Sequence, residues 1–175
     1  TVPFGPTTKA KQLNHGGATS PPQTTTGFNI SATYDVDVRT EITDNSGAGL
    51  NKKYLYYIAT KQSVASPPSN IVQYNAVAMN PVSGSIYNAV IPKQKDKRVW
   101  YFMVSQDNQG NWDRDPELQN TAQYTAYTFD QDNPCNNIPN PPTGVGLDQN
   151  TMTLSWTAPT LNTDGSLLND LAGYY

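Results

Sequence analysis

The side chains best suited to chemistry gather in the stretch DNQGNWDRDPE, residues 107–117. Its acids and its central amide are Asp107, Asn111, Asp113, Asp115 and Glu117. Carboxylate and amide oxygens bind Ca²⁺, and two neighbouring carboxylates can act as general acid and base. The spacing, however, does not match an EF-hand loop. We expect a polar hairpin turn with solvated acids. A structural calcium site at Asp107, Asn111, Asp113 and Asp115 is the alternative, and acid–base catalysis is not expected.

Nucleophilic catalysis needs a base beside the nucleophile, and the chain contains a single histidine, His15. It lies in LNHGG with no second metal ligand nearby, so we interpret it as a solvated loop residue. The single cysteine, Cys135, forms no CxxC or Cys/His zinc spacing. It is a free thiol, a partner for a cysteine elsewhere in a longer chain, or an intermolecular bridge. The sequence therefore predicts a protein that is not an enzyme and has no cofactor, structural calcium excepted.

Aromatic residues are the other candidates for a site. Trp112 follows the turn, where its flat ring system could stack on a sugar ring or could cover the end of the fold. The 11 tyrosines are numerous enough that some must face solvent and could form a protein contact surface. The candidates are those at residues 54–57, Tyr124 and Tyr127. Carbohydrate and protein partners are both retained as hypotheses.

Charge and hydropathy exclude two classes of partner. Charged residues make up 14% of the 175-residue chain and the formal net charge is −3, whereas a nucleic-acid-binding protein needs a clustered basic face. The one basic run, Lys93, Lys95, Lys97 and Arg98, is interpreted as a solvated turn. No apolar stretch approaches the roughly 20 residues that cross a bilayer, so no membrane insertion is expected in this segment.

Neutral polar residues replace the charged ones, accompanied by 14 Pro and 12 Gly. Such residues suit β-surfaces, while Pro and Gly suit many short turns. By association, this composition favours an extracellular or cell-surface location. The first residues, TVPFGPTTKAK, lack the apolar core of a signal peptide, so we expect the chain to begin after processing or inside a longer precursor.

The element that must position the acidic turn is the strand before it, RVWYFMVSQ at residues 98–106. Val99, Tyr101 and Met103 alternate with Trp100 and Phe102, and both sets are apolar. This pattern predicts a strand that is covered on both faces, as in the middle of a sandwich. Residues 36–42 instead alternate apolar or Thr side chains with charged ones, which is typical of a half-buried antiparallel strand.

Six or seven strands separated by turns are expected over residues 28–130, without helical periodicity. The predicted fold class is all-β, with an antiparallel β-sandwich in this range. Residues 1–27 are rich in Pro, Thr and Gly and are interpreted as a linker or an irregular lead-in strand. Residues 131–140 form a Pro/Asn-rich linker, and residues 141–175 begin a second, incomplete domain.

The stretch NPPTGVGLDQNTMTLSWTAPTLNTDGSLLNDLAGYY, residues 140–175, resembles the first part of a fibronectin type III domain. The similarity is carried by Pro141, Pro142, Gly144, Val145, Leu147, the stripe Met152, Leu154 and Trp156, and Pro159. The resemblance implies an incomplete sandwich, in which Leu154 and Trp156 are exposed because so few strands cannot form a two-sheet core. We expect either a fragment of a longer chain or strands supplied by another chain.

Residues 28–130 show a weaker resemblance to Ig-like or fibronectin-like domains of bacterial secreted and surface proteins, carried by DVRTEITDNSG, KKYLYYI, YNAVIP and YFMVSQDNQGN. It implies a displayed β-sandwich and brings no active site. The expected function is a non-catalytic structural or interaction module that spaces, displays or assembles other domains of the same longer chain or neighbouring subunits. One alternative is an accessory domain of a secreted enzyme or cofactor-bearing protein whose active part lies outside this segment. The other is a subunit of an extracellular filament with strands shared between chains.

Overall fold

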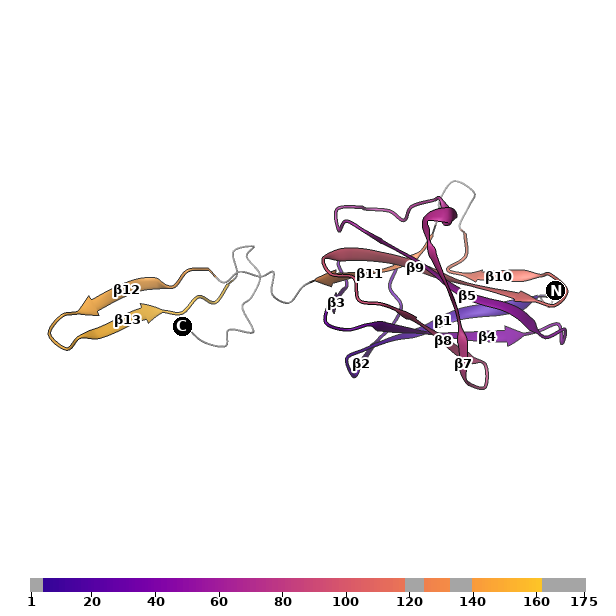
Figure 1. Cartoon of the computed structure of the whole chain (residues 1–175), viewed down its shortest axis with the longest axis horizontal. Coiled ribbons are helices and arrows are strands. Elements are labelled where there is room, and N and C mark those ends of the chain that lie inside the picture. Colours follow the sequence, from indigo (N-terminus) through magenta and orange to yellow (C-terminus); the bar gives the residue numbers. More distant parts are fainter. Residues whose placement is uncertain (1–4, 119–124, 133–139, 162–175) are drawn as a thin grey trace. The chain divides into compact units, whose positions relative to one another are not determined.

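The computed structural model describes residues 5–118, 125–132 and 140–161. The chain separates into two compact units, Thr1–Asn133 and Pro134–Tyr175 (Figure 1). Regular structure in the described residues is almost entirely β, with one 3₁₀ turn, η1 (Ile71–Gln73). None of the helical structure described there is long and apolar enough to span a membrane.

Two β-sheets pack face to face in the first unit (Figure 1). Sheet I has the order β2-β1-β4-β8-β7 and consists of β1 (Pro6–His15), β2 (Ala18–Ser20), β4 (Val36–Asp44), β7 (Asn80–Ser83) and β8 (Ile86–Ile91). Sheet II has the order β3-β11-β9-β5-β6 and consists of β3 (Asn29–Ser31), β5 (Leu50–Thr60), β6 (Asn75–Ala78), β9 (Lys97–Asp107) and β11 (Tyr127–Asp132), with β10 (Trp112–Asp115) also paired to β9. Every described pairing is antiparallel except that of β11 with β3. The predicted all-β antiparallel sandwich is confirmed.

Strand β9 is the centre of sheet II because both of its edges and both of its faces are occupied. β5 pairs along one edge, while β10 and β11 share the other. Val99, Tyr101 and Met103 point between the sheets and are 0% exposed. Trp100 and Phe102 point to the opposite side, the outer face of sheet II, and are also buried. The prediction of a strand covered on both faces is confirmed.

The main core fills the space between the two sheets. Its buried residues are Leu13, Ile30, Val36, Val38, Ile42, Leu55, Tyr57, Met79, Ala89, Ile91, Val99, Tyr101, Met103 and Phe129. Strand β4 contributes alternate side chains to it, as its sequence pattern predicted. Because each strand gives every second residue to this core, loss of one large side chain leaves a cavity that its neighbours cannot fill.

A smaller core covers part of the outer face of sheet II. There the segment of residues 61–74 lies against β9, and the Tyr74 ring packs edge-on against Phe102 with centroids 5.3 Å apart. The Tyr74 hydroxyl donates to the Pro68 carbonyl at 2.9 Å, which holds the Pro-rich turn in place. Trp100 and Ala126 complete this cluster. The apolar side chains on both faces of β9 are thus covered, by sheet I on one face and by the small core on the other.

Residues 1–27 were expected to be a linker or an irregular lead-in strand, and the linker alternative is wrong for β1 and β2. Strand β1 pairs with β4 along nearly all of its length and buries Leu13 completely. Most of its other side chains are polar, and a register shift between Ala10 and Gln12 interrupts the alternation. A period-two apolar signal is therefore absent from the sequence. Nine described strands, β3 to β11, begin within residues 28–130, where six or seven were expected.

The second unit contains a hairpin of β12 (Thr143–Asp148) and β13 (Thr153–Thr157). Leu154 and Trp156 are 55% and 43% exposed, as expected of an incomplete sandwich. Met152, expected in the same stripe, lies instead in the turn before β13 with a φ of 53°. Residues 162–175 and most of the predicted linker lie outside the described residues. The fibronectin resemblance stays a prediction.

Phe129 offers a direct test of the core, since it is fully buried with its ring centroid 5.9 Å from that of Tyr101. We expect Phe129→Ala to lower the free energy of unfolding by about 3–5 kcal/mol, because it opens a cavity between the sheets. Val82→Ala, on the exposed edge strand β7, is the control and should change it by less than about 0.5 kcal/mol. Urea unfolding followed by circular dichroism measures both. Equal effects of the two substitutions would contradict the assigned core.

Candidate functional site

The outer face of sheet II is hollowed where the 61–74 segment does not cover it. Three depressions of about 480, 310 and 280 Å³ adjoin one another there, and Trp112 lines all three. We call this surface the aromatic groove. Its main lining residues are Lys52, Tyr54 and Tyr56 of β5, Ala76 of β6, Val104 and Gln106 of β9, and Trp112 and Arg114 of β10, with Ile71 and Leu118 at one border.

Cross-strand pairing aligns these side chains in rows. Trp112 lies opposite Gln106, and Gln106 lies opposite Lys52 on its other side. In the next row, Tyr54 lies opposite Val104. Residues that lie opposite each other on paired strands point to the same face of the sheet. The outward-facing side chains of neighbouring strands therefore lie next to one another. Segments that are distant in sequence thereby form one surface.

The floor of the aromatic groove is a packed set of rings beneath the exposed side chains. The rings of Tyr56 and Phe102 are stacked, with centroids 5.0 Å apart and an interplanar angle of 7°. Tyr54 continues the set, 6.2 Å from Tyr56. The guanidinium carbon of Arg114 lies 4.1 Å from the centroid of Phe102, a cation–π arrangement. Arg114 is itself buried and donates to backbone carbonyls of the loop that follows β10.

Trp112 is the most exposed aromatic side chain among the described residues, at 61%. It therefore does not close off the end of the sandwich, which was one of the two expectations for it. Ile71 and Leu118, on the border of the groove, are also exposed. An exposed apolar patch with a polar rim marks an interaction surface more often than an inert one.

Asp107 is used inside the turn that joins β9 to β10. Its carboxylate accepts hydrogen bonds from the backbone N–H groups of Gln109 and Asn111 and from the side-chain amide of Asn111, each at 2.9 Å. A fourth comes from the Ser46 hydroxyl at 3.2 Å. These donors, the Asn111 amide foremost, hold the pKa of Asp107 below its usual value. The polar turn expected from the sequence is present, but Asp107 is buried there and not solvated as expected.

Asp113 and Asp115 bind strand β1 of the opposite sheet. The Asp113 carboxylate accepts a hydrogen bond from the backbone N–H of Thr8, and the Asp115 carboxylate accepts one from that of Ala10, both at 2.5 Å. The hydroxyls of Thr8 and Ser105 also lie 2.6 Å apart. Backbone N–H groups at a strand edge need acceptors when they are taken from water. The two acids supply them and so join the sheets.

The four residues of the calcium hypothesis are thus divided between two structural tasks. Asp107 and Asn111 bond to each other within the turn, whereas Asp113 and Asp115 bond to β1. Across residues 5–118, 125–132 and 140–161, no group of three or more His, Cys, Asp or Glu side chains could hold a metal ion. The calcium site stays a prediction that this geometry does not support.

Tyr127 is turned inward, so it does not contribute to the contact surface for which it was a candidate. Its ring centroid lies 5.5 Å from that of Tyr101, and its hydroxyl is 3.0 Å from both carboxylate oxygens of Asp115. Burial and the charge of Asp115 raise the pKa of Tyr127, and burial raises that of Tyr101. Both hydroxyls stay protonated at neutral pH, so neither can act as a base. Tyr124 lies outside the described residues.

The tyrosines at residues 54–57 divide by strand parity. Tyr54 and Tyr56 line the aromatic groove, while Tyr57 belongs to the main core. The sequence predicts this division, because successive residues of a strand point to opposite faces of the sheet. It did not show that β10 would place Trp112 and Arg114 on the same face.

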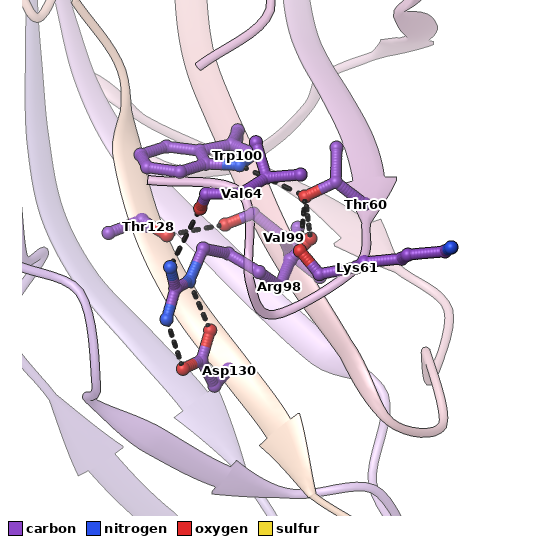
Figure 2. Close-up of polar contacts among 8 residues, drawn as sticks. All are labelled: Thr60, Lys61, Val64, Arg98, Val99, Trp100, Thr128 and Asp130. Carbon is purple, nitrogen blue, oxygen red and sulfur yellow. Dashed lines mark hydrogen bonds and ion pairs between the residues drawn. The ribbon is translucent and has the colours of Figure 1, made fainter. Parts of the chain in front are cut away.

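The solvated interpretation of the basic run is wrong for Arg98, which is buried in an ion pair (Figure 2). Its Nε and Nη2 donate to the two carboxylate oxygens of Asp130, at 2.7 and 2.8 Å. Its Nη1 donates to the Val64 carbonyl at 2.7 Å, while the Trp100 indole donates to the Thr60 hydroxyl at 3.2 Å. The hydrogen bonds to Asp130 raise the pKa of Arg98. We call this set the Arg98 clasp, because it ties the 61–74 segment to β9 and β11.

The remaining candidates add no catalytic set in the described part of the chain. His15 hydrogen-bonds with the Ser20 hydroxyl at 2.9 Å and so closes the β1–β2 hairpin, while Cys135 lies outside the described residues. The aromatic groove, by contrast, is lined by aromatic rings, phenolic hydroxyls, an amide and an ammonium group. No protein-family model matches the chain, and no curated protein matches it significantly.

From the Arg98 clasp we expect a large loss of stability when its carboxylate, Asp130, is removed. We expect Asp130→Ala to lower the free energy of unfolding by about 3–5 kcal/mol, because a buried guanidinium is left without its partner. Lys11→Ala breaks the exposed Lys11–Glu41 pair and should cost no more than about 1 kcal/mol. Urea unfolding compares the two. If the costs are equal, the clasp is not a buried ion pair in solution.

Asp107 predicts a pH dependence. Since its folded-state pKa is lowered, its contribution to stability is fully present above the unfolded-state pKa of about 4 and is lost as the pH falls through the folded value. We expect the free energy of unfolding to fall below about pH 4, and Asp107→Asn to make that fall shallower. Denaturant unfolding at a series of pH values measures this. Identical pH profiles for the two proteins would rule out the effect.

Proposed function

We propose that the chain is a non-catalytic interaction module of a larger secreted or cell-surface protein, and that the aromatic groove is its contact surface. The observation that carries this proposal is the exposure of Trp112 at the junction of three depressions on one sheet face. Burying such a side chain in a complex gains a large contact area, and Trp is among the residues that dominate binding energies.

The scaffold suits holding a partner. The centre of the groove lies on four hydrogen-bonded strands, β6, β5, β9 and β10, and loop residues form only its border. Its floor is packed before any partner arrives, so little conformational entropy is lost on binding. A rigid two-sheet body of this kind also serves to space and display neighbouring domains.

The assignment as non-catalytic draws on how the acidic side chains are used. Asp107, Asp113 and Asp115 each accept hydrogen bonds from backbone N–H groups, so their oxygens support the fold. The extracellular location draws on composition alone. We expect this chain to be part of a longer protein, and the module would space the other domains of that protein.

The proposal is tested with two panels of immobilised ligands, one of polysaccharides and one of peptides and extracellular proteins, probed with the full chain. We expect at least one ligand in either panel to bind about 30-fold more weakly, or worse, to Trp112→Ala. Trp156→Ala, which removes an exposed indole from the second unit, is the control and should bind normally.

Two results would overturn the proposal. In the first, every ligand found binds Trp112→Ala as well as it binds the original chain. In the second, incubation with the chain cleaves or otherwise converts a panel member, which would make the protein an enzyme. Thermal unfolding of each variant shows whether a loss of binding reflects a loss of fold.

A further inference from the structure

We infer that the ligand of the aromatic groove is a neutral polysaccharide chain of equatorially substituted pyranose rings, with Trp112 as its stacking platform. This rests on the proposed function, because it names the ligand class of the same surface. The argument has four parts: the platform, the polar rim, the closed backbone and the charge.

The platform matches one face of a sugar ring. A pyranose with equatorial hydroxyls presents axial C–H groups on its faces and hydroxyls around its rim. Those C–H groups carry partial positive charge, and the face of an indole is partially negative. Trp112 provides an exposed indole, and Tyr54 and Tyr56 provide further rings along the same groove. Rings repeated along one surface suit a ligand whose apolar faces also repeat.

The rim matches the hydroxyls. Gln106 lies beside Trp112 in the adjacent strand, and Lys52 lies beside Gln106, so an amide and an ammonium group stand next to the indole. The amide nitrogen of Gln106 already donates to the Gly110 carbonyl at 3.1 Å, so its oxygen and its second N–H remain for a ligand. Tyr54 adds a phenolic hydroxyl, and Ser69 adds a hydroxyl on the far border. Each is a hydrogen-bonding group that a sugar hydroxyl can meet as either donor or acceptor, apart from the ammonium group, which only donates.

The backbone beneath the groove disfavours an extended peptide. Peptides commonly bind sheets by adding a strand at a free edge, where unpaired backbone groups accept them. Here the central part of the floor is formed by β5, which pairs with both β9 and β6, and by β9, which pairs with both β5 and β10. In that central part only side chains are offered to the ligand, while the free edge of β6 lies at the border of the groove. A polysaccharide, which is dense in hydroxyl groups, can bind through side chains alone.

Charge decides between neutral and acidic polysaccharides. The border near Trp112 carries the exposed Glu117, the buried Arg114 is engaged with Phe102 and the following loop, and Lys52 is the cation lining the depression beside Tyr54. The whole chain has a formal net charge of −3. A polyanion would meet repulsion with little compensation, so a neutral chain is the better fit.

The test is affinity electrophoresis of the full chain through gels that contain neutral hydroxyethylcellulose, a xylan, a β-1,3-glucan or, as the anionic comparison, polygalacturonate. Fluorescence titration with the matching neutral oligosaccharides gives the dissociation constants. We expect retardation by at least one neutral polymer and none by polygalacturonate. Trp112→Ala should bind about 30-fold more weakly or worse, Tyr54→Ala should also bind more weakly, and Trp156→Ala should be unchanged. Raising the salt concentration should leave the affinity for the neutral polymer intact.

The possible outcomes separate the two proposals. Retardation by a neutral polymer that depends on Trp112 supports both. Trp112-dependent binding found only among peptides or proteins overturns the polysaccharide inference and leaves the proposed function standing. Retardation by polygalacturonate alone, or binding that salt abolishes, overturns the assignment as neutral. Absence of any Trp112-dependent binding, in variants whose thermal unfolding is unchanged, overturns both.

Discussion

The rest of the structure depends on one constraint: strand β9 is apolar on both faces and must be covered twice. Full burial of a side chain such as Tyr101 or Phe102 is worth about 1.5–3 kcal/mol, so neither face can be left to water. Sheet I covers the inner face, and the 61–74 segment covers part of the outer one. The second cover is a loop with little regular structure, and the Arg98 clasp is what holds it there.

Strand β10 shows how four residues can serve two surfaces. Asp113 and Asp115 face sheet I and bond to β1, while Trp112 and Arg114 face outward and form part of the aromatic groove. Alternation along a strand makes this division unavoidable. Asp113 and Asp115, which the sequence suggests as metal ligands, instead accept hydrogen bonds from backbone N–H groups at the edge of β1. The residues of β10 that remain open to a partner are therefore those on its outward face, where Trp112 is exposed.

Partial coverage of the outer face also links stability to binding. Phe102 lies under both the small core with Tyr74 and the floor of the aromatic groove with Tyr56 and Arg114. The clasp that secures the loop thus helps to fix the rings on which a ligand would rest. An open face of this kind is stable only because the exposed groups stand on a packed layer.

By itself, the sequence determined the fold class and the central strand, because the alternation of side chains along β4 and β9 is a local property that survives in any strand. It also identified Trp112, Tyr54 and Tyr56 as candidate contact residues. The tertiary structure decided which groups meet. Arg98 finds Asp130 32 residues further along the chain, and Thr8 finds Asp113 at a separation of 105. Such pairings depend on strand order and register, to which β1 and its interrupted alternation gave no local clue.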